Sequence, residues 1–441
     1  IDEWLNNGMK GMLEMATGTG KTYTALGALE VATNRYDKIV TIISCPYQHL
    51  IQQWKKEIKK FGTPYDKLII ADSSNSSWKN SLADILSDFI LGYNKRIIIL
   101  TTHRTLSSND FIEIITSNSI ENIFIIGDEV HGLGAEKSRQ GLLHIYKLRL
   151  GLSATPKRFF DTEGTDIIYN YFGKVVYEFN LGKAINTINP ATGYTYLTPY
   201  YYIPLTVSLT IDEIEDFIEK TKSIILNLNR AKEDKEKKEL LKLLLIKRAN
   251  IIKNAEEKYQ LLRNLLEKLD QIKWAIVYTS PQQIDKVMSI VNDKDLSAHR
   301  FTMEEGTSPK KEYGGLSERE YILNRFSDGD YQVLVAMKCL DEGVDVPPAR
   351  TAILMASCEN PREYIQRIGR VIRRYPHKSE ATIYDILVVP STINLPKELK
   401  QIEMNIFRKE LNRYEEIAKY ALNSSDALKS IEKIKTKLRG V

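Results

Sequence analysis

Hydrophobic residues in the first 179 positions fall into short continuous runs that alternate with stretches of helical periodicity. The runs are rich in β-branched residues and lack the period-two alternation of a half-exposed strand. Strands that are buried on both faces of a parallel sheet need such continuous runs. The pattern therefore predicts an α/β lobe over residues 1–179, with strands that begin near Ile39, Arg96, Ile123 and Arg149.

The same alternation returns over residues 270–392. A helical pattern from Arg319 to Phe326 separates two of its apolar runs. The pattern predicts a second α/β lobe, whose likeness to the first is one of rhythm alone. Its runs begin at Trp274, Tyr331, Thr351 and Ile383.

Residues 180–269 separate the two lobes and contain long helical patterns. Apolar residues keep helical spacing from Ile211 to Leu228, a charged stretch follows, and a second leucine-rich pattern runs to about Leu269. We expect a linker strand followed by an antiparallel pair of helices. The tyrosine-rich segment from Tyr194 to Tyr202 has two interpretations, a strand that packs on a lobe or a platform on which exposed bases stack.

The two ends of the chain have helical patterns of their own. Residues 393–441 form a helical tail, for which capping of the second lobe and contact with DNA or a partner are both open interpretations. The first eight residues read as the second half of a helix that ends at Gly8. We therefore expect the first lobe to be truncated at its N-terminus.

The composition is typical of a globular protein outside the membrane, but it does not identify a binding partner. The chain has 441 residues, 43% hydrophobic and 27% charged, and no apolar run approaches the ~20 residues that span a bilayer. We therefore expect no membrane partner. The net charge of +5 permits nucleic-acid binding without indicating it. Cys45, Cys339 and Cys358 show no paired spacing for zinc or disulfides, which favours a reducing, cytoplasmic setting.

The string MATGTGKT, from Met15 to Thr22, joins a strand-like run to a helix-forming run. Glycines in such a loop let backbone N–H groups close on phosphates, Lys21 reaches the β- and γ-phosphates, and Thr22 can bind Mg²⁺. The pattern predicts a site for ATP and Mg²⁺. The residues predicted to hold the nucleotide are Thr17, Gly18, Thr19, Gly20, Lys21 and Thr22.

The string GDEVH follows an apolar run and places two carboxylates at the carboxyl end of a strand, where open α/β sheets bind ligands. We expect Asp128 to hold the metal and Glu129 to orient and deprotonate a water. His131 is a candidate for coupling the nucleotide state to other motifs. We interpret His103, His144, His299 and His377 as structural or surface residues.

The string EYIQRIGRVIRR in the second lobe places Gln366, Arg370 and Arg373 at helical spacing, so that we expect all three on one face of a helix. An arginine fork can neutralise charge on the γ-phosphate in the transition state. Because these arginines are predicted in the other lobe, hydrolysis would require the lobes to close on one nucleotide.

Eight strings stand in the order and rough spacing of the motifs of superfamily 2 helicases. They are MATGTGKT, SCPYQHLIQQW, TTHRTL, DEVH, GLSATP, AIVYTS, CLDEGVDVP and QRIGRVIR. Nearly the whole chain resembles the DEAD/DEAH-type branch that contains the type III restriction Res subunits and the XPB-like DNA helicases. The resemblance implies an α/β fold of two tandem RecA-like, P-loop NTPase domains that bind ATP between them.

The resemblance also implies roles for residues whose local pattern says little. Ser153 and Thr155 would couple hydrolysis to the nucleic-acid grip, and Gly343 and Asp345 would contact the nucleotide from the second lobe. Contacts to one strand of nucleic acid would come from Pro46, Thr102, Thr279 and Lys338.

Two features depart from relatives in this superfamily, Met15 in place of the small residue that many of them have, and one missing residue. The glutamine that reads adenine ahead of the first motif is absent, which fits a missing N-terminal segment. Gln366 stands where many RNA helicases have histidine, and Val130 where they have alanine. Both differences favour DNA over RNA.

Two functional hypotheses follow from the resemblance. The first is an ATP-dependent helicase or translocase on duplex DNA, the motor of a bacterial restriction, antiphage defence or repair system with a nuclease or other subunit as partner. The second is a nucleic-acid-activated ATPase switch that signals to an effector. The sequence itself shows no nuclease signature.

Overall fold

The computed structural model describes residues 1–158, 161–228, 235–269, 271–306, 308–337, 346, 348–356, 361–389, 407, 411–412 and 414–439. Contacts divide the chain into two compact units, Ile1–Tyr196 and Leu197–Val441. The four-part division at residues 179, 269 and 392 stays a prediction.

Unit 1 is built on a seven-stranded sheet in which every pair of neighbouring strands is parallel. The strand order is β3-β4-β2-β5-β6-β1-β7. The strands predicted from the apolar runs are confirmed. The strands of the whole sheet are β1 (Lys10–Met15), β2 (Ile39–Cys45), β3 (Lys67–Ala71), β4 (Arg96–Thr102), β5 (Ile123–Asp128), β6 (Leu148–Ser153) and β7 (Val175–Phe179), of which β3 and β7 were not predicted.

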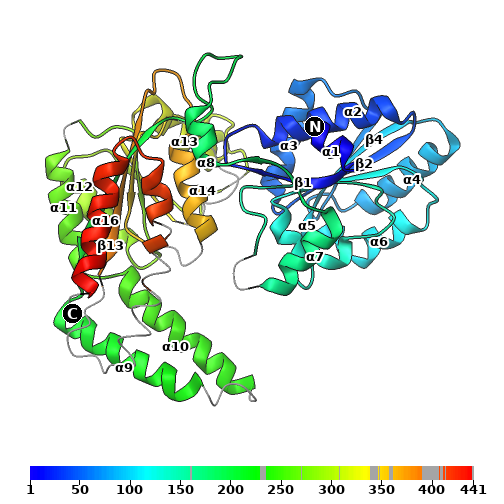
Figure 1. Ribbon diagram of the computed structural model, residues 1–441. Helices are drawn as coiled ribbons and strands as arrows, with labels where there is room; N and C mark the ends of the chain where they lie inside the picture. The colour runs from blue at the N-terminus through cyan, green and yellow to red at the C-terminus, as the bar shows by residue number, and fades with distance from the viewer. Residues whose placement is uncertain are drawn as a thin grey trace. The chain divides into compact units, whose positions relative to one another are not determined.

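Helices cover both faces of this sheet (Figure 1). Apolar residues of α4, α6 and α7 share one core cluster with β1, β2, β4 and β5, and α2 and α3 lie over the opposite face. The helices are α1 (Asp2–Asn6), α2 (Lys21–Arg35), α3 (Gln48–Phe61), α4 (Trp78–Leu91), α5 (His103–Leu106), α6 (Asn109–Thr116), α7 (Thr162–Phe172) and α8 (Leu181–Asn186), with 3₁₀ turns η1 (Val130–Gly134) and η2 (Arg139–Gly141).

Unit 2 has a six-stranded parallel sheet in the order β10-β11-β9-β12-β13-β8. The first of these strands in the chain, which the sequence analysis assigned to a linker, pairs along its whole length with β13 and forms one edge of the sheet. The strands are β8 (Tyr200–Val207), β9 (Ala275–Tyr278), β10 (Ala298–Phe301), β11 (Val333–Ala336), β12 (Thr351–Leu354) and β13 (Ala381–Val388). The helices around it are α11 (Glu257–Lys268), α12 (Ile284–Asn292), α13 (Glu318–Asp328), α14 (Pro361–Val371) and α16 (Ser424–Arg439), with the 3₁₀ turn η4 (Lys311–Tyr313).

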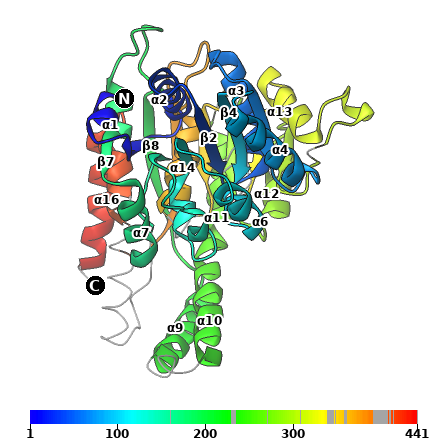
Figure 2. The ribbon, with the colours of Figure 1, turned by 90° about the vertical axis from the view of Figure 1, so that its right-hand side faces the viewer.

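The predicted helical pair is confirmed in α9 (Ile211–Leu228) and α10 (Lys235–Lys253), which lie side by side away from the sheet (Figure 2). Arg248 joins them, since its Nε donates to Thr221 Oγ1 at 2.9 Å and its guanidinium lies over the Phe217 ring. The second predicted helix does not run unbroken to Leu269. It stops near Asn254, whose side chain accepts from Ser280 Oγ at 2.5 Å, and α11 then packs into the core of unit 2.

The tail packs on unit 2, as the capping interpretation expects. The described α16 contacts β8, and Tyr200 Oη donates to the carbonyl of Ile417 at 2.7 Å. Ile402 and Ile406 of the predicted tail helix lie outside the described residues. None of the helices described above combines the length and apolar content that crossing a lipid bilayer requires.

Candidate nucleotide site and its coupling loops

The loop between β1 and α2 has the conformation that a phosphate cradle needs. Gly18 and Gly20 have φ of 85° and 96°, a left-handed region that residues with a Cβ rarely adopt. Thr19 Oγ1 donates to the carbonyl of Ala16 at 2.6 Å and closes the loop internally. The N-terminus of α2 has no side-chain cap and no acidic residue in its first turn. Its free N–H groups and positive dipole end therefore suit an anion.

Two side chains of the loop add to the fit with a triphosphate. Thr17 Oγ1 is buried and has no hydrogen-bond partner within the described ranges, so a polar ligand would satisfy it. Lys21 Nζ is 3.5 Å from Glu129 Oε1, with only 11% of the lysine side chain exposed. At that distance the ion pair is loose, and phosphate oxygens can replace the carboxylate as the lysine's partner.

Asp128 ends β5 and is held by two donors. Trp54 Nε1 donates to Asp128 Oδ2 at 2.9 Å, and the Glu129 amide donates to Asp128 Oδ1 at 3.0 Å. Burial raises the pKa of Asp128 to about 6, repulsion from Glu129 adds to the rise, and Lys21 opposes it. A carboxylate with a raised pKa beside a second carboxylate gains from a cation.

Carboxylate oxygens such as those of Asp128 and Glu129 are ligands of the kind that Mg²⁺ takes. The described part of the chain contains no group of three His, Cys, Asp or Glu side chains that would form a complete metal cage. Mg²⁺ typically binds through one or two protein oxygens together with substrate phosphates and waters. Thr22, in the first turn of α2, and Asp128 are the residues that fit this pattern.

The turn after Asp128 brings the predicted coupling residues together. Glu129 has φ of 46°, a strained value for a residue with a Cβ, and starts the 3₁₀ turn η1. His131 Nδ1 is 3.5 Å from Glu129 Oε2 and 3.3 Å from Ser153 Oγ. The amide of Thr155 donates to Ser153 Oγ at 3.1 Å. One chain of polar contacts thus leads from the carboxylate pair to the end of β6.

His103 lies beside the same turn, where the sequence analysis expected only a structural or surface residue. His103 Nδ1 is 2.8 Å from Ser44 Oγ on β2, and a Cβ on Gly132 would approach the ring to 2.9 Å. Burial lowers the pKa of His103 to about 4, opposed by the backbone of Glu129 and Asp128. The ring is therefore a neutral contact between β2, the start of α5 and the turn that follows the carboxylates.

The predicted nucleic-acid residues of unit 1 follow neighbouring strands. Pro46 comes directly after β2. Thr102 is the last residue of β4, and in the register of the sheet it lies opposite Cys45, the last residue of β2. Thr102 Oγ1 accepts from the Thr105 amide at 3.1 Å and caps α5. Both residues lie at the carboxyl edge of the sheet, on adjacent strands.

In unit 2 the arginine-bearing segment differs from the prediction in one respect. Gln366 and Arg370 are buried residues of α14, but the helix ends at Val371, so Arg373 does not share a helical face with them. The chain instead pairs there with Leu197 in an isolated antiparallel bridge. The prediction of one helical face for all three residues is therefore wrong.

Other predicted residues of unit 2 are only partly described. Thr279 follows β9 and is buried, and its amide and Oγ1 donate to the carbonyl of Ala336 at 2.9 and 3.3 Å. Gly343, Asp345 and Lys338 lie outside the described residues.

A buried cluster of hydroxyls and a carboxylate anchors α14 to the sheet of unit 2. Tyr364 Oη on α14 donates to Asp385 Oδ2 at 2.5 Å, and Tyr202 Oη on β8 donates to the same oxygen at 2.8 Å. Burial raises the pKa of Tyr202 well above its ordinary value, with Asp385 adding to the rise. The arginine-bearing helix is thus tied to β13 and β8 through one carboxylate.

Two family models and several known proteins match the chain. Residues 1–158 match the type III restriction enzyme, res subunit, and residues 257–375 match the helicase conserved C-terminal domain. The DNA 3'-5' translocase XPB2 of Sulfurisphaera tokodaii is 29% identical over 417 residues, which cover 88% of this chain and 79% of that protein. The type I restriction enzyme EcoAI endonuclease subunit of Escherichia coli is 23% identical over 84% of this chain, which spans 42% of that subunit.

Two solved structures share the fold. The ATP-dependent Type ISP restriction-modification enzyme LlaBIII bound to DNA has a TM-score of 0.57 and 16% identity, over 92% of this chain and 28% of that one. The Hef helicase domain of Pyrococcus furiosus has a TM-score of 0.51 and 14% identity, over 88% of this chain and 94% of that one. At these identities the likeness concerns the fold alone.

Proposed function

Because this chain belongs to the superfamily 2 helicases, in the branch of the type III restriction Res subunits and XPB-like translocases, we propose that it hydrolyses ATP to move along duplex DNA. Its two parallel sheets are the tandem RecA-like domains of this family of nucleic-acid-dependent ATPases. The observation that carries the proposal is the juxtaposition of Lys21, on the open phosphate cradle, with the carboxylates of Asp128 and Glu129.

The contacts of Glu129 suggest how nucleotide binding prepares the base. The Glu129 carboxylate contacts both Lys21 and His131. Phosphate oxygens that bind Lys21 Nζ draw it away from Glu129, which leaves Oε1 able to accept a proton from the attacking water. Mg²⁺, held by Thr22 and Asp128, would neutralise charge on the phosphates.

Arg370 and Arg373 are the proposed arginine fingers, with Gln366 beside them. Fingers of this kind contribute roughly 10³ to 10⁵ in rate in other nucleotide hydrolases. Gly343 and Asp345 would complete the nucleotide contacts from unit 2. Because these residues belong to unit 2 while Lys21 belongs to unit 1, hydrolysis would require both units to close on one nucleotide, and that closure is the proposed source of movement.

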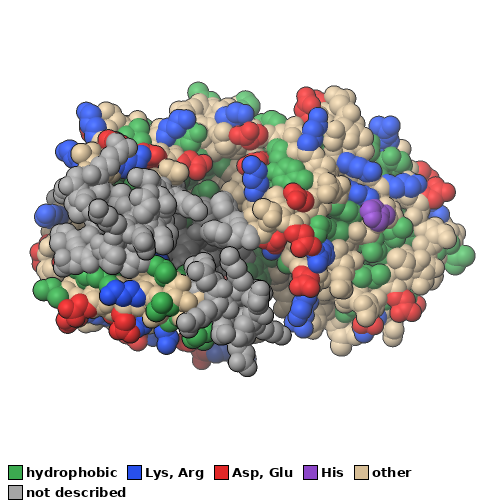
Figure 3. All heavy atoms as spheres, turned by 60° about the horizontal axis from the view of Figure 1, so that its bottom comes forward, with side chains coloured by type: hydrophobic (Ala, Val, Ile, Leu, Met, Phe, Trp, Pro, Cys, Tyr) green, Lys and Arg blue, Asp and Glu red, His purple; other side chains and the backbone are tan. Residues whose placement is uncertain are grey.

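The proposed grip on nucleic acid rests on small polar groups and backbone at the ends of strands, from Pro46, Thr102, Thr279 and Lys338. Contacts to the phosphate backbone carry no sequence information, which suits a motor that must pass along any sequence. On the face that Figure 3 draws, lysine and arginine side chains are interspersed with acidic ones among the described residues, so charge does not indicate where nucleic acid would bind there.

His131, Ser153 and Thr155 are proposed to report the state of the carboxylates to this grip. Their contacts form a continuous chain from Glu129 to the segment after β6. His103 offers a second link, because its ring contacts Ser44, two residues before Pro46, and packs against Gly132.

The preference for DNA and the cellular role are proposed from relatives. The matched translocase is named for DNA, and two other matches are restriction enzymes, one of them solved bound to DNA. We infer a cytoplasmic motor in a restriction, antiphage defence or repair system, working with a nuclease or another subunit. Cys45, a buried free thiol, fits that reducing setting.

The first experiment measures ATP hydrolysis with duplex DNA, single-stranded DNA, RNA or no nucleic acid. Glu129→Gln should abolish hydrolysis, whereas Glu121→Gln, at an exposed glutamate just before β5, should leave it unchanged. Stimulation by duplex DNA supports the motor, and stimulation by RNA alone contradicts the proposed substrate.

A second measurement separates a motor from a switch. Displacement of a third strand from a triplex, driven by ATP, requires directional movement along the duplex. Hydrolysis that is stimulated by duplex DNA without any triplex displacement would favour a nucleic-acid-activated switch.

A further inference from the structure

Thr198 and Lys378 donate to three consecutive backbone carbonyls, at the last residue of α14 and at the two residues that follow it. The carbonyl of Ile372 accepts from the Thr198 amide at 2.7 Å. The carbonyl of Arg373 accepts from Thr198 Oγ1 at 3.1 Å and from Lys378 Nζ at 2.9 Å. Lys378 Nζ also donates to the carbonyl of Val371. The last carbonyls of a helix lack intrahelical partners, so these bonds fix where α14 ends and how the chain leaves it.

One of the two residues belongs to the segment through which the chain enters unit 2. Leu197 is the first residue of that unit, and it forms an antiparallel bridge with Arg373. Thr198 is completely buried, and its amide and its hydroxyl donate to the carbonyls of Ile372 and Arg373. Strand β8 begins two residues later. The connection between the units is therefore hydrogen-bonded to the residue proposed as a finger.

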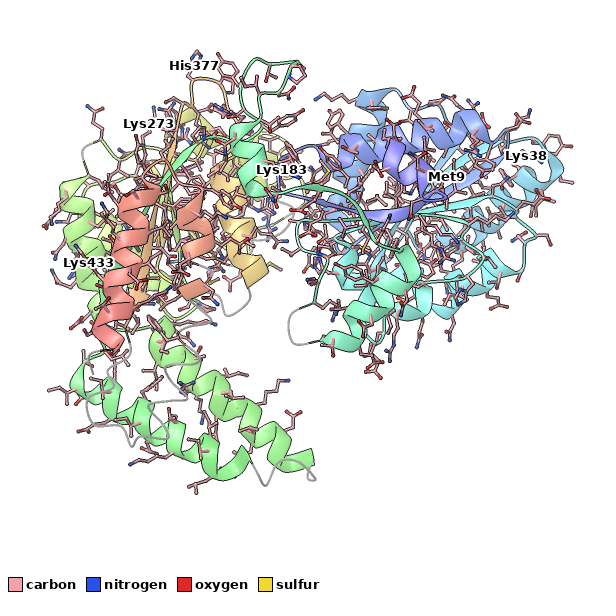
Figure 4. All side chains as sticks on the ribbon, viewed as in Figure 1. Met9, Lys38, Lys183, Lys273, His377 and Lys433 are labelled. Atoms are coloured by element: carbon pink, nitrogen blue, oxygen red, sulfur yellow. The ribbon has the colours of Figure 1, made fainter. Side chains whose placement is uncertain are left out.

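The other residue, Lys378, reaches the same carbonyls from the opposite side in sequence. A tight turn from Tyr375 to Lys378, closed by a 3.1 Å bond between the Lys378 amide and the Tyr375 carbonyl, reverses the chain. Its third residue, His377, has φ of 60° and lies on the outer loop of unit 2 (Figure 4). The reversal buries Lys378, of which 4% is exposed. The negative end of the helix dipole stabilises an ammonium group at the C-terminus of a helix.

We propose that Thr198 and Lys378 are positioning residues for Arg373, and that they couple the inter-unit connection to the arginine finger. The proposal rests on the finger role assigned to Arg373 under the proposed function. Because a shift of the Leu197–Thr198 segment displaces the carbonyls to which it is bonded, movement of one unit relative to the other changes where the Arg373 guanidinium lies. Misplacing a catalytic group by about 1 Å can cost on the order of 100-fold in rate.

The test compares kcat and KM for ATP, with duplex DNA present, among variants of the full chain. Thr198→Val removes the hydroxyl with little change in volume, and Lys378→Met removes the ammonium and keeps the aliphatic stem. We expect kcat to fall about 5- to 100-fold while KM for ATP changes less than about twofold. Thr198→Ser should restore kcat, and Thr206→Val, at an exposed threonine on β8, should match the parent. Thermal unfolding verifies that each variant folds.

A double-mutant cycle with Arg373→Ala decides between positioning and general damage. If Thr198 and Lys378 act through Arg373, neither substitution lowers kcat further once the arginine is absent. Independent, multiplicative losses in the Arg373→Ala background would overturn the inference, as would a normal kcat in both single variants. Unchanged hydrolysis in Arg373→Ala alone would instead contradict the finger role, and with it that part of the proposed function.

Discussion

Asparagine in place of Asp128 should make unit 1 more stable while it abolishes hydrolysis. The folded carboxyl has a pKa of about 6, against an ordinary value of 3.8. The folded protein thus binds this proton more readily than the unfolded chain does, so stability falls as pH rises from about 4 to about 6, and the whole cost is present at pH 7. A shift of this size corresponds to about 3 kcal/mol.

The expected net gain is smaller than that figure. Compared with the neutral carboxyl, asparagine has one acceptor oxygen for two donors, the Trp54 indole and the Glu129 amide, and losing one hydrogen bond to a neutral group costs about 1 kcal/mol. Solvent also reaches part of the side chain. We therefore expect Asp128→Asn to gain about 1–2 kcal/mol at pH 7.5, or roughly 2–8 °C in melting temperature.

Urea unfolding without nucleotide or Mg²⁺, followed by tryptophan fluorescence, measures the effect. Trp4, Trp54 and Trp78 belong to unit 1 and only Trp274 to unit 2, so the signal reports mainly on unit 1. Asp84→Asn, at an exposed position on α4, is the matched control. A variant no more stable than the parent at pH 7.5, or a gain that persists undiminished at pH 4, would refute the reasoning.

Three further predictions concern the same region. Trp54→Phe removes a donor to Asp128, a bond to a charged group worth about 1.5–3 kcal/mol, so the pKa of Asp128 should rise further and hydrolysis at pH 6.5 should need about tenfold more Mg²⁺, a difference that shrinks at pH 8.5. The pKa of His103 is lowered to about 4 from 6.5, so its burial contributes stability that is complete above pH 6.5 and lost as pH falls toward 4. In an Asp128→Asn background, adding His103→Phe should therefore reduce the loss of unfolding free energy between pH 6.5 and pH 4 by up to about 3 kcal/mol. An unchanged loss would exclude His103 as its source. Gly132→Ala would bring a Cβ to 2.9 Å from the His103 ring, and we expect about 1–3 kcal/mol lower stability with reduced DNA-stimulated hydrolysis, whereas a variant as stable and active as the parent would contradict the tight packing.

The strands that the apolar runs predicted lie mainly in the interior of the two sheets, and the strands that they missed lie at the edges. β3, β7 and β10, which no apolar run predicted, are edge strands, and β8, which was assigned to a linker, is another. An edge strand has a neighbouring strand on one side only, and in β7 the exposed Glu178 interrupts the continuous apolar pattern on which the prediction depended.

Within the site, the motifs predicted which residues gather at the phosphate cradle but not what holds them there. Lys21, Glu129, His131 and Ser153 lie in one series of contacts, because each lies at or beyond the carboxyl end of a strand of one parallel sheet, while their roles stay predictions. Trp54 lies 74 positions from Asp128 in the sequence and reaches it because α3 packs on the sheet. No local sequence pattern predicts such a hydrogen bond. Its only sequence signal was its place at the end of SCPYQHLIQQW.

The end of α14 shows a second limit of periodicity. Helical spacing continues through Arg373, yet the helix stops at Val371 because Leu197 and Thr198 pair with the residues that follow. A tertiary hydrogen bond thus overrides a local preference. Residues that are separated by more than 170 positions decide the geometry of a predicted catalytic arginine.

The pairing of β8 with β13 bears on how this protein can be divided for expression. A fragment that starts at residue 270, where the apolar rhythm resumes, would lack β8 and expose eight residues of β13 as an unpaired edge. It would also leave Asp385 without the Tyr202 hydroxyl and the C-terminal tail without the strand on which it packs. The second compact unit begins at Leu197, so a fragment that keeps these contacts must start there and include the helical pair as well.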